Sequence, residues 1–184
     1  MSDTIFYINL MIHYIIFGLV VWSIFFSSKR IWPPPSKQSW QYKTYWSLFY
    51  VAVILDIFLI VQEFNIWIIP NDISYFIGIF LILIGTFIVS YGIYTLGIKN
   101  TYGLEDGFTA KSSYKCTRNP QYLGDIILSL GLILFVNSLH ITILLILTII
   151  IFIIMPLSEE LWLEEKYILN IKIKLQDFYK PKFI

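Results

Sequence analysis

Long apolar runs separated by short polar segments dominate the pattern of hydrophobic and polar positions along the chain. Three of these runs cover residues 4–26, 44–62 and 74–96. A helix needs about 20 apolar residues to cross the ~30 Å hydrocarbon core of a bilayer. We therefore predict three membrane-spanning helices within residues 1–96. No basic segment precedes the first run, so we expect a retained span rather than a signal peptide.

A fourth apolar block covers residues 122–156, and the polar residues Asn137, Ser138 and His140 interrupt it near its middle. The block is long enough for two short helices joined by a tight turn. We interpret it as a helical hairpin whose two ends return to the same side of the membrane. Each arm is short for a complete span, so the pattern leaves open whether the arms cross the bilayer fully.

Composition supports a membrane assignment. Hydrophobic residues make up 58% of the chain and charged residues 14%, which is more apolar than a soluble domain of this size can bury. We therefore predict an all-α integral membrane protein with three spans, the hairpin and a tail. The net charge of +1 gives no support for nucleic-acid binding. One cysteine, Cys116, and two isolated histidines, His13 and His140, give no metal-ligand spacing, so we expect no metal.

The thirteen lysine and arginine residues predict the orientation of the chain. All of them lie in the loop after the first run, in the loop after the third run, or in the carboxyl-terminal tail. The other loops hold the acidic residues Asp3, Glu63 and Asp72 and no basic residue. Basic residues concentrate in cytoplasmic loops. We therefore expect the amino terminus outside and the carboxyl terminus in the cytosol.

Five glycines predict how two of the helices pack. Gly78, Gly85 and Gly92 recur every seven residues in the third run, and Gly124 and Gly131 repeat this spacing in the hairpin. Small residues at such intervals let helix backbones approach closely in lipid. The spacing therefore predicts that the third helix packs on the hairpin.

Two ionisable residues lie inside the predicted spans. His13 and Asp56 both fall about 9 to 14 Å from the outer helix ends at ~1.5 Å per residue, so they are able to pair. We interpret them as a structural pair, with a proton relay as the alternative. Between the first two spans, the Trp-Pro-Pro-Pro sequence at 32–35 excludes a helix. We interpret it as a stiff interfacial connector with no chemical role.

Two stretches concentrate the polar chemistry of the chain. The first, Y-K-C-T-R-N-P-Q-Y-L-G at 114–124, carries the Arg118 guanidinium, which suits a carboxylate, directly before the hairpin. The second, S-E-E-L-W-L-E-E-K-Y at 158–167, places four carboxylates just after the hairpin. Beyond it, apolar residues share one helical face and predict a cytosolic amphipathic tail helix on the membrane surface or capping the bundle: Ile168, Ile171, Leu175 and Phe178.

Taken together, the two stretches resemble the integral membrane methyltransferases that include isoprenylcysteine carboxyl methyltransferase and the phospholipid methyltransferases. That family has an Arg-His/Asn-Pro-x-Tyr-x-Gly string before a helical hairpin, then a Glu-Glu pair, a leucine and an aromatic residue after it. The matching positions here are Arg118, Asn119, Pro120, Tyr122, Gly124, Glu159, Glu160, Leu163 and Tyr167. The chain departs from the family at Ser112 and Ser113, where relatives have glycine followed by proline or alanine. Asn119 stands where many relatives have histidine.

The resemblance implies a pocket for S-adenosylmethionine at the cytosolic base of the hairpin, with a lipophilic acceptor entering from the bilayer. It implies Arg118 at the cofactor carboxylate, Glu159 or Glu160 at its amino group or ribose, and an aromatic ring, Tyr122 or Trp162, at the adenine or sulfonium. Arg118, Glu159 and Glu160 are the expected catalytic residues. The expected cofactor-binding residues are Tyr114, Arg118, Asn119, Pro120, Tyr122, Leu123, Gly124, Glu159, Glu160, Trp162 and Leu163.

We interpret residues 1–96 as a transmembrane scaffold and residues 97–184 as the cofactor-binding region of one domain. The expected partners are the bilayer and a lipophilic or lipidated acceptor. Two alternatives stay open. Membrane sterol reductases have a related carboxyl-terminal pattern and use NADPH, although this chain is short for them. A non-catalytic membrane scaffold explains the spans and the glycines but leaves the arginine and glutamate stretches without a role.

Overall fold

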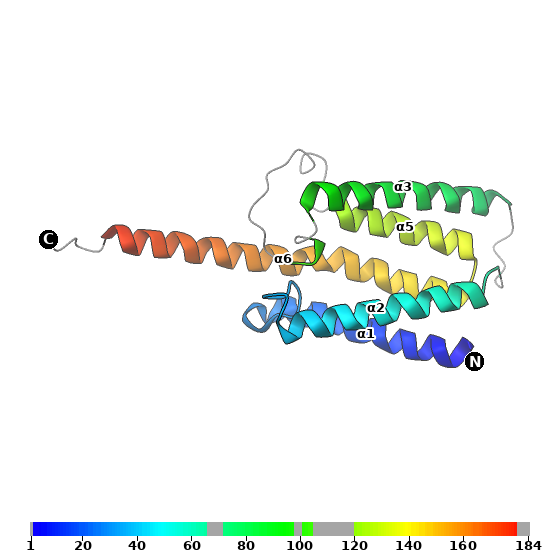
Figure 1. The fold of residues 1–184 in the computed structure, drawn as a ribbon, viewed down its shortest axis with the longest axis horizontal. Helices are drawn as coiled ribbons and strands as arrows, with labels where there is room; N and C mark the ends of the chain where they lie inside the picture. The colour runs from blue at the N-terminus through cyan, green and yellow to red at the C-terminus, as the bar shows by residue number, and fades with distance from the viewer. Residues whose placement is uncertain (1, 66–71, 98–100, 105–119, 180–184) are drawn as a thin grey trace.

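The computed structural model describes residues 2–65, 72–97, 101–104 and 120–179, and this part of the chain contains helices and no strand. Five long helices form an elongated bundle, and a short 3-10 turn, η1 (Ser27–Lys29), follows the first of them (Figure 1). The helices are α1 (Ser2–Phe25), α2 (Trp40–Gln62), α3 (Asp72–Leu96), α5 (Pro120–Val136) and α6 (Leu139–Tyr179). The predicted all-helical fold is confirmed.

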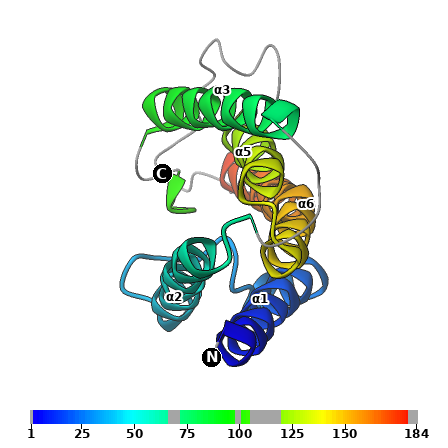
Figure 2. The ribbon, with the colours of Figure 1, turned by 90° about the vertical axis from the view of Figure 1, so that its right-hand side faces the viewer.

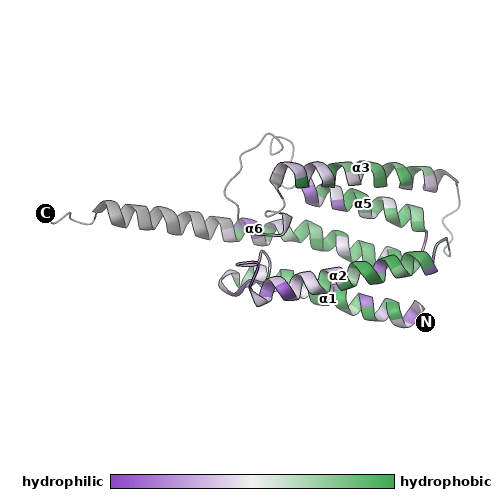
Figure 3. Cartoon of the chain, in the orientation of Figure 1, coloured by the Kyte–Doolittle hydropathy of each residue, from purple (hydrophilic) through white to green (hydrophobic). Residues whose placement is uncertain are grey.

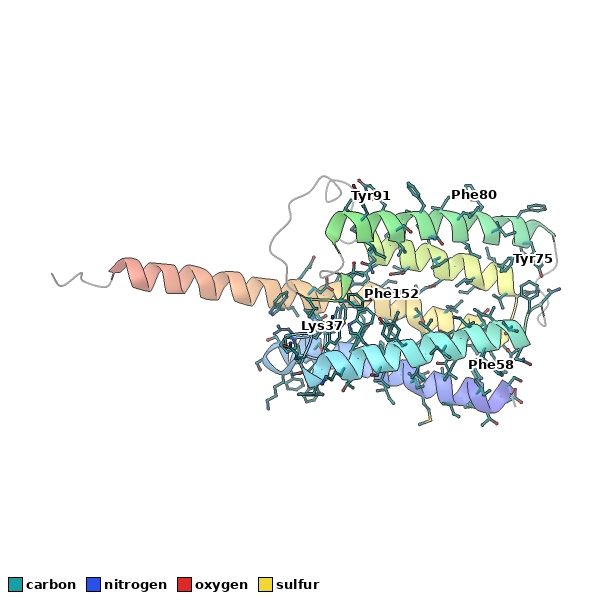
Figure 4. The ribbon with its side chains drawn as sticks, in the orientation of Figure 1. Lys37, Phe58, Tyr75, Phe80, Tyr91 and Phe152 are labelled. Carbon is teal, nitrogen blue, oxygen red and sulfur yellow. The ribbon has the colours of Figure 1, made fainter. Side chains whose placement is uncertain are left out.

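Four of these helices are long and apolar enough to cross a membrane: α1, α2, α3 over Ser74–Thr95, and α6 over Leu139–Trp162. Their outer faces are also apolar (Figure 3). On α3, Phe76, Phe80 and Phe87 are 74%, 62% and 72% exposed, and Phe80 and Tyr91 point away from the bundle (Figure 4). Apolar surface of this extent suits contact with lipid tails rather than water. The chain is therefore an integral membrane protein.

The helices pack in the spatial order α3, α5, α6, α1, α2, so that α6 contacts both α5 and α1 (Figure 2). The connector 26–39, residues 101–104 and the projecting part of α6 lie at one end of the bundle, which we call the connector end (Figure 1). The amino terminus and the turn between α5 and α6 lie at the opposite end. This arrangement agrees with the predicted common side for the first loop and the tail.

Glycine contacts hold α3 against α5, as the sequence predicted. A Cβ atom built on Gly85 would lie 2.5 Å from the backbone nitrogen of Leu128, and one on Gly124 would lie 2.7 Å from that of Val89. Real Cβ atoms do not approach backbone so closely. The two backbones therefore meet at a distance that only glycine permits.

The turn between α5 and α6 lies at Asn137 and Ser138, where the hairpin was predicted to reverse. Asn137 has a φ of +52° and donates from Nδ2 to Asn65 Oδ1 at 2.9 Å. Ser138 donates to Glu63 Oε2 at 2.7 Å, and His140 Nδ1 lies 2.8 Å from Glu63 Oε1. The polar residues of the turn are thus satisfied by the carboxyl-terminal end of α2.

The second arm of the hairpin differs from the prediction. We expected two short arms and a separate tail helix, but α6 continues through Pro156 as one helix to Tyr179. A proline inside a helix removes one backbone donor, and membrane helices tolerate this loss because local side chains adjust. Ser158 Oγ donates to the Met155 carbonyl at 2.9 Å next to the proline. The tail helix extends beyond the bundle in line with α6, so it does not cap the bundle (Figure 1).

The predicted pairing of His13 with Asp56 is confirmed. His13 Nε2 lies 3.6 Å from Asp56 Oδ2, and Asn9 donates from Nδ2 to Asp56 Oδ1 at 2.7 Å. His13 Nδ1 lies 3.0 Å from the Asn9 carbonyl oxygen. Helices α1 and α2 thus share a polar contact inside the bundle, which reduces the cost of placing a carboxylate there.

Candidate functional site

A glutamate near the end of the apolar part of α6 is the centre of a polar cluster at the connector end. Glu159 Oε1 accepts a hydrogen bond from the Tyr122 hydroxyl, on the first turn of α5. The same oxygen accepts from Trp32 Nε1 at 3.0 Å. The structure therefore brings together three side chains from distant parts of the sequence, two of which were predicted site residues.

Trp32 corrects the interpretation of the connector. The 32–35 segment is non-helical as predicted, but Trp32 is not an interfacial anchor, because the residue is 2% exposed and bonded to Glu159. Its ring lies 4.5 Å from that of Tyr45 on α2. The indole N–H needs an acceptor when buried, and the carboxylate supplies one. No helical spacing or sequence string indicates this contact, which joins residues 127 apart.

The backbone of the connector is fixed by a buried serine on α1. Ser23 Oγ accepts hydrogen bonds from the backbone N–H groups of Ile31 at 2.9 Å and Trp32 at 3.0 Å, and donates to the Leu19 carbonyl at 2.7 Å. The Arg30 Nε donates to the Pro33 carbonyl at 2.8 Å. These bonds set the direction in which the Trp32 side chain leaves the connector.

Aromatic rings surround the cluster. Tyr122 stacks on Phe152 of α6 with ring centroids 5.9 Å apart. The Tyr45 hydroxyl donates to Met155 Sδ at 3.6 Å. The described part of the site therefore combines a carboxyl group with aromatic side chains.

Residues 101–104 lie over the connector and the start of α2. The Tyr102 ring is 4.7 Å from that of Trp46. Gly103 has a φ of +69°, and a Cβ atom built on it would lie 2.9 Å from Pro34 Cδ and 3.0 Å from Trp32 Cη2. This close approach requires glycine and covers the edge of the Trp32 ring.

The other predicted site residues have varied surroundings. Pro120 is buried at the start of α5, Gly124 packs on α3, and Leu123 is 43% exposed. Glu160 is partly buried beside Glu159. The Arg30 guanidinium carbon lies 4.8 Å from the centre of the Trp162 ring.

Four predicted residues lie outside the described part of the site: Tyr114, Arg118, Asn119 and the side chain of Leu163. Within the described ranges, no group of three or more His, Cys, Asp or Glu side chains is placed to hold a metal ion. The site that the structure describes thus consists of carboxylates, aromatic rings and hydrogen-bond donors.

A family model described as phospholipid methyltransferase matches residues 73–169, which is more than half of the chain. The match begins at the start of α3 and ends within α6, so it includes Tyr122 and Glu159 but not Trp32. Searches of curated proteins and of solved structures each gave no match.

Proposed function

Because the chain belongs to the phospholipid methyltransferase family, we propose that it transfers the methyl group of S-adenosylmethionine to a lipophilic acceptor in the bilayer. The observation that carries this proposal is the Glu159 carboxylate, held by Tyr122 and Trp32 at the end of a membrane helix. Unlike Asp56 and Glu63, whose carboxylates join helices elsewhere in the bundle, Glu159 lies at the connector end within the region that the family model matches.

The chemistry of the described side chains fits this cofactor. S-adenosylmethionine carries an ammonium group and a sulfonium group, and both are positive. Carboxylates such as Glu159 form strong charge-assisted hydrogen bonds with ammonium groups. Aromatic rings such as Tyr122 and Tyr45 attract cations through their faces. NADPH carries several phosphates, and carboxylates repel them, so this part of the site favours the methyl donor over the dinucleotide.

When bound, S-adenosylmethionine would supply a methyl group, which bonds to the acceptor atom as the methyl–sulfur bond breaks in line and S-adenosylhomocysteine leaves. In such a reaction the protein mainly holds the two reactants in position. We assign Glu159 and Glu160 to the cofactor amino group or ribose hydroxyls, and Tyr122 or Trp162 to its adenine or sulfonium. Arg118 is assigned to the cofactor carboxylate.

The remaining proposed contacts come from Tyr114, Asn119, Pro120, Leu123, Gly124 and Leu163. Under this proposal residues 97–184 supply most of the cofactor site, and residues 1–96 form the scaffold that carries Trp32.

The acceptor is proposed to enter sideways from the bilayer. The long apolar run of α6 ends at Leu157, and Glu159 follows two residues later, which corresponds to about 3 Å along a helix. The carboxylate is therefore near the depth of lipid head groups. Lateral entry avoids moving an acyl or isoprenoid chain into water, which costs about 0.8 kcal/mol for each CH₂.

Methyl-transfer assays test the proposal. We expect purified protein incubated with methyl-labelled S-adenosylmethionine to label a product that partitions into organic solvent when membrane lipids or prenylcysteine analogues are supplied. A pool of soluble metabolites should give no labelled product. Label only in water-soluble products would contradict lateral entry. No label in any mixture, together with consumption of NADPH, would favour a reductase instead.

We further propose that the connector end faces the cytosol, because the basic residues flank it. Cys116 is the single cysteine of the chain, and in the sequence it lies between α3 and α5. We expect a membrane-impermeant thiol reagent to label it after permeabilisation of cells and not before. A denatured sample provides the control for reagent access to the thiol. Labelling in intact cells would reverse the proposed orientation.

A further inference from the structure

We infer that Trp32 is a positioning residue for Glu159, so that the connector between α1 and α2 is part of the functional site. This inference rests on the proposed function. It adds a residue from outside the matched region 73–169, which contains the glutamate but not the tryptophan. Three features of Trp32 support this role: its hydrogen bond to Glu159, the contacts that hold its ring in place, and the acceptor atom that it shares with Tyr122.

The hydrogen bond between Trp32 Nε1 and Glu159 Oε1 joins a group that is only a donor to a group that accepts. The indole Nε1 has one hydrogen and no free lone pair, while an ionised carboxylate is an acceptor. The distance of 3.0 Å is that of a good N–H···O hydrogen bond. When the carboxylate is ionised, the bond is charge-assisted and stronger than one between neutral groups. It therefore holds the Glu159 side chain in a defined rotamer.

Trp32 is held in place by contacts that do not involve Glu159. Its backbone N–H donates to Ser23 Oγ at 3.0 Å, and its ring packs against Tyr45 at 4.5 Å. Gly103 lies against the far edge of the ring. The position of the indole is therefore fixed by these contacts, and its hydrogen bond positions the more flexible Glu159 carboxylate.

Both hydrogen bonds that the structure describes at this carboxylate end on the same atom. Tyr122 and Trp32 donate to Glu159 Oε1. Two donors on one oxygen fix the plane of the carboxylate and direct the other oxygen, Oε2. We assign Oε2 to the amino group or ribose of the cofactor. A site ordered before binding loses less conformational entropy when the ligand arrives.

A purely structural role for Trp32 is the competing explanation, because its ring also belongs to the apolar cluster at the connector end. Replacing Trp32 with phenylalanine separates the two roles, since it keeps an aromatic ring and removes the donor. Trp22→Phe is a matched control. Trp22 is 45% exposed, and its Nε1 donates to the Lys29 carbonyl at 3.3 Å rather than to a carboxylate.

The experiment measures S-adenosylmethionine affinity by displacement of the labelled cofactor from five proteins: wild type, Trp32→Phe, Glu159→Ala, the double variant of these two changes, and Trp22→Phe. We expect Trp32→Phe to weaken binding about tenfold, as for the loss of one charge-assisted bond. The same change in the Glu159→Ala background should have little further effect, because the acceptor of the indole N–H is already gone. Trp22→Phe should bind normally.

Three outcomes would count against the inference. Unchanged affinity of Trp32→Phe would overturn it, and so would independent, additive losses in the double variant. A thermal unfolding scan of each protein identifies a variant that has lost affinity only because it is unfolded, and Trp32→Phe losing both together would assign Trp32 a structural role. If the wild type itself bound no S-adenosylmethionine, the proposed function would be wrong, which distinguishes that failure from failure of the Trp32 role.

Discussion

Glu159→Ala should reduce S-adenosylmethionine affinity by roughly a hundredfold or more and abolish detectable methyl transfer. Losing one charge-assisted contact to the cofactor costs about 1.5 to 3 kcal/mol, or about tenfold to hundredfold in affinity. The alanine also leaves the Tyr122 hydroxyl and the Trp32 indole N–H without their acceptor. The predicted loss is therefore larger than for a residue that touches only the cofactor. Calorimetry with the purified protein measures it.

The control for this variant is a carboxylate at the other end of the bundle. The Asp3 side chain is 76% exposed and lies 4.0 Å from His140 Nε2. Asp3→Ala removes the same charge far from Glu159, so it should leave affinity and methyl transfer unchanged. Equal losses in both variants would indicate a general effect of charge or folding. Normal affinity of Glu159→Ala would remove this residue from the site.

Gly85→Val should prevent α3 from packing on α5. A Cβ atom at this position would lie 2.5 Å from Leu128 N and 2.9 Å from the Gly124 carbonyl oxygen, and backbone atoms cannot rotate away. Even one added methylene in a packed core costs about 1 to 3 kcal/mol, and valine adds three carbon atoms. We expect the thermal unfolding midpoint in detergent to fall by at least about 10 °C.

Gly18 is the matched control for this variant, because a Cβ atom built on it meets nothing within 4 Å. Gly18 lies on α1, which is also long enough to span a membrane. Gly18→Val should therefore keep the wild-type unfolding midpoint to within a few degrees. Similar midpoints for Gly18→Val and Gly85→Val would show that the close contact between α3 and α5 does not contribute to stability.

Features with a local or periodic signal could be predicted from the sequence. The spans follow from apolar runs of the length of a bilayer core. The packing of α3 on α5 follows from glycines seven residues apart, since that spacing repeats on one face of a helix. The pairing of His13 with Asp56 follows from their similar depth and from the cost of an isolated charge in lipid.

Features that depend on distant contacts could not be predicted. The bond between Trp32 and Glu159 joins a connector to a helix that begins more than a hundred residues later. A tryptophan near a membrane surface is usually an anchor, and only the fold shows that this one is buried. The length of α6 was missed for a different reason. Pro156 was interpreted as the end of the hairpin, but membrane helices accommodate proline more readily than soluble ones.

Because α6 is one continuous helix, its part within the bundle and its projecting part are directly connected. Glu159 contacts α5 and the connector, and the same helix continues to Tyr179, a further ~30 Å at ~1.5 Å per residue. Rotation of the distal part of α6 about the helix axis would also rotate the Glu159 carboxylate. The hydrogen bond from the Trp32 indole, which is held by contacts to α1 and α2, would oppose this rotation. The orientation of Glu159 is therefore tied through one continuous helix to that of the distal part of α6.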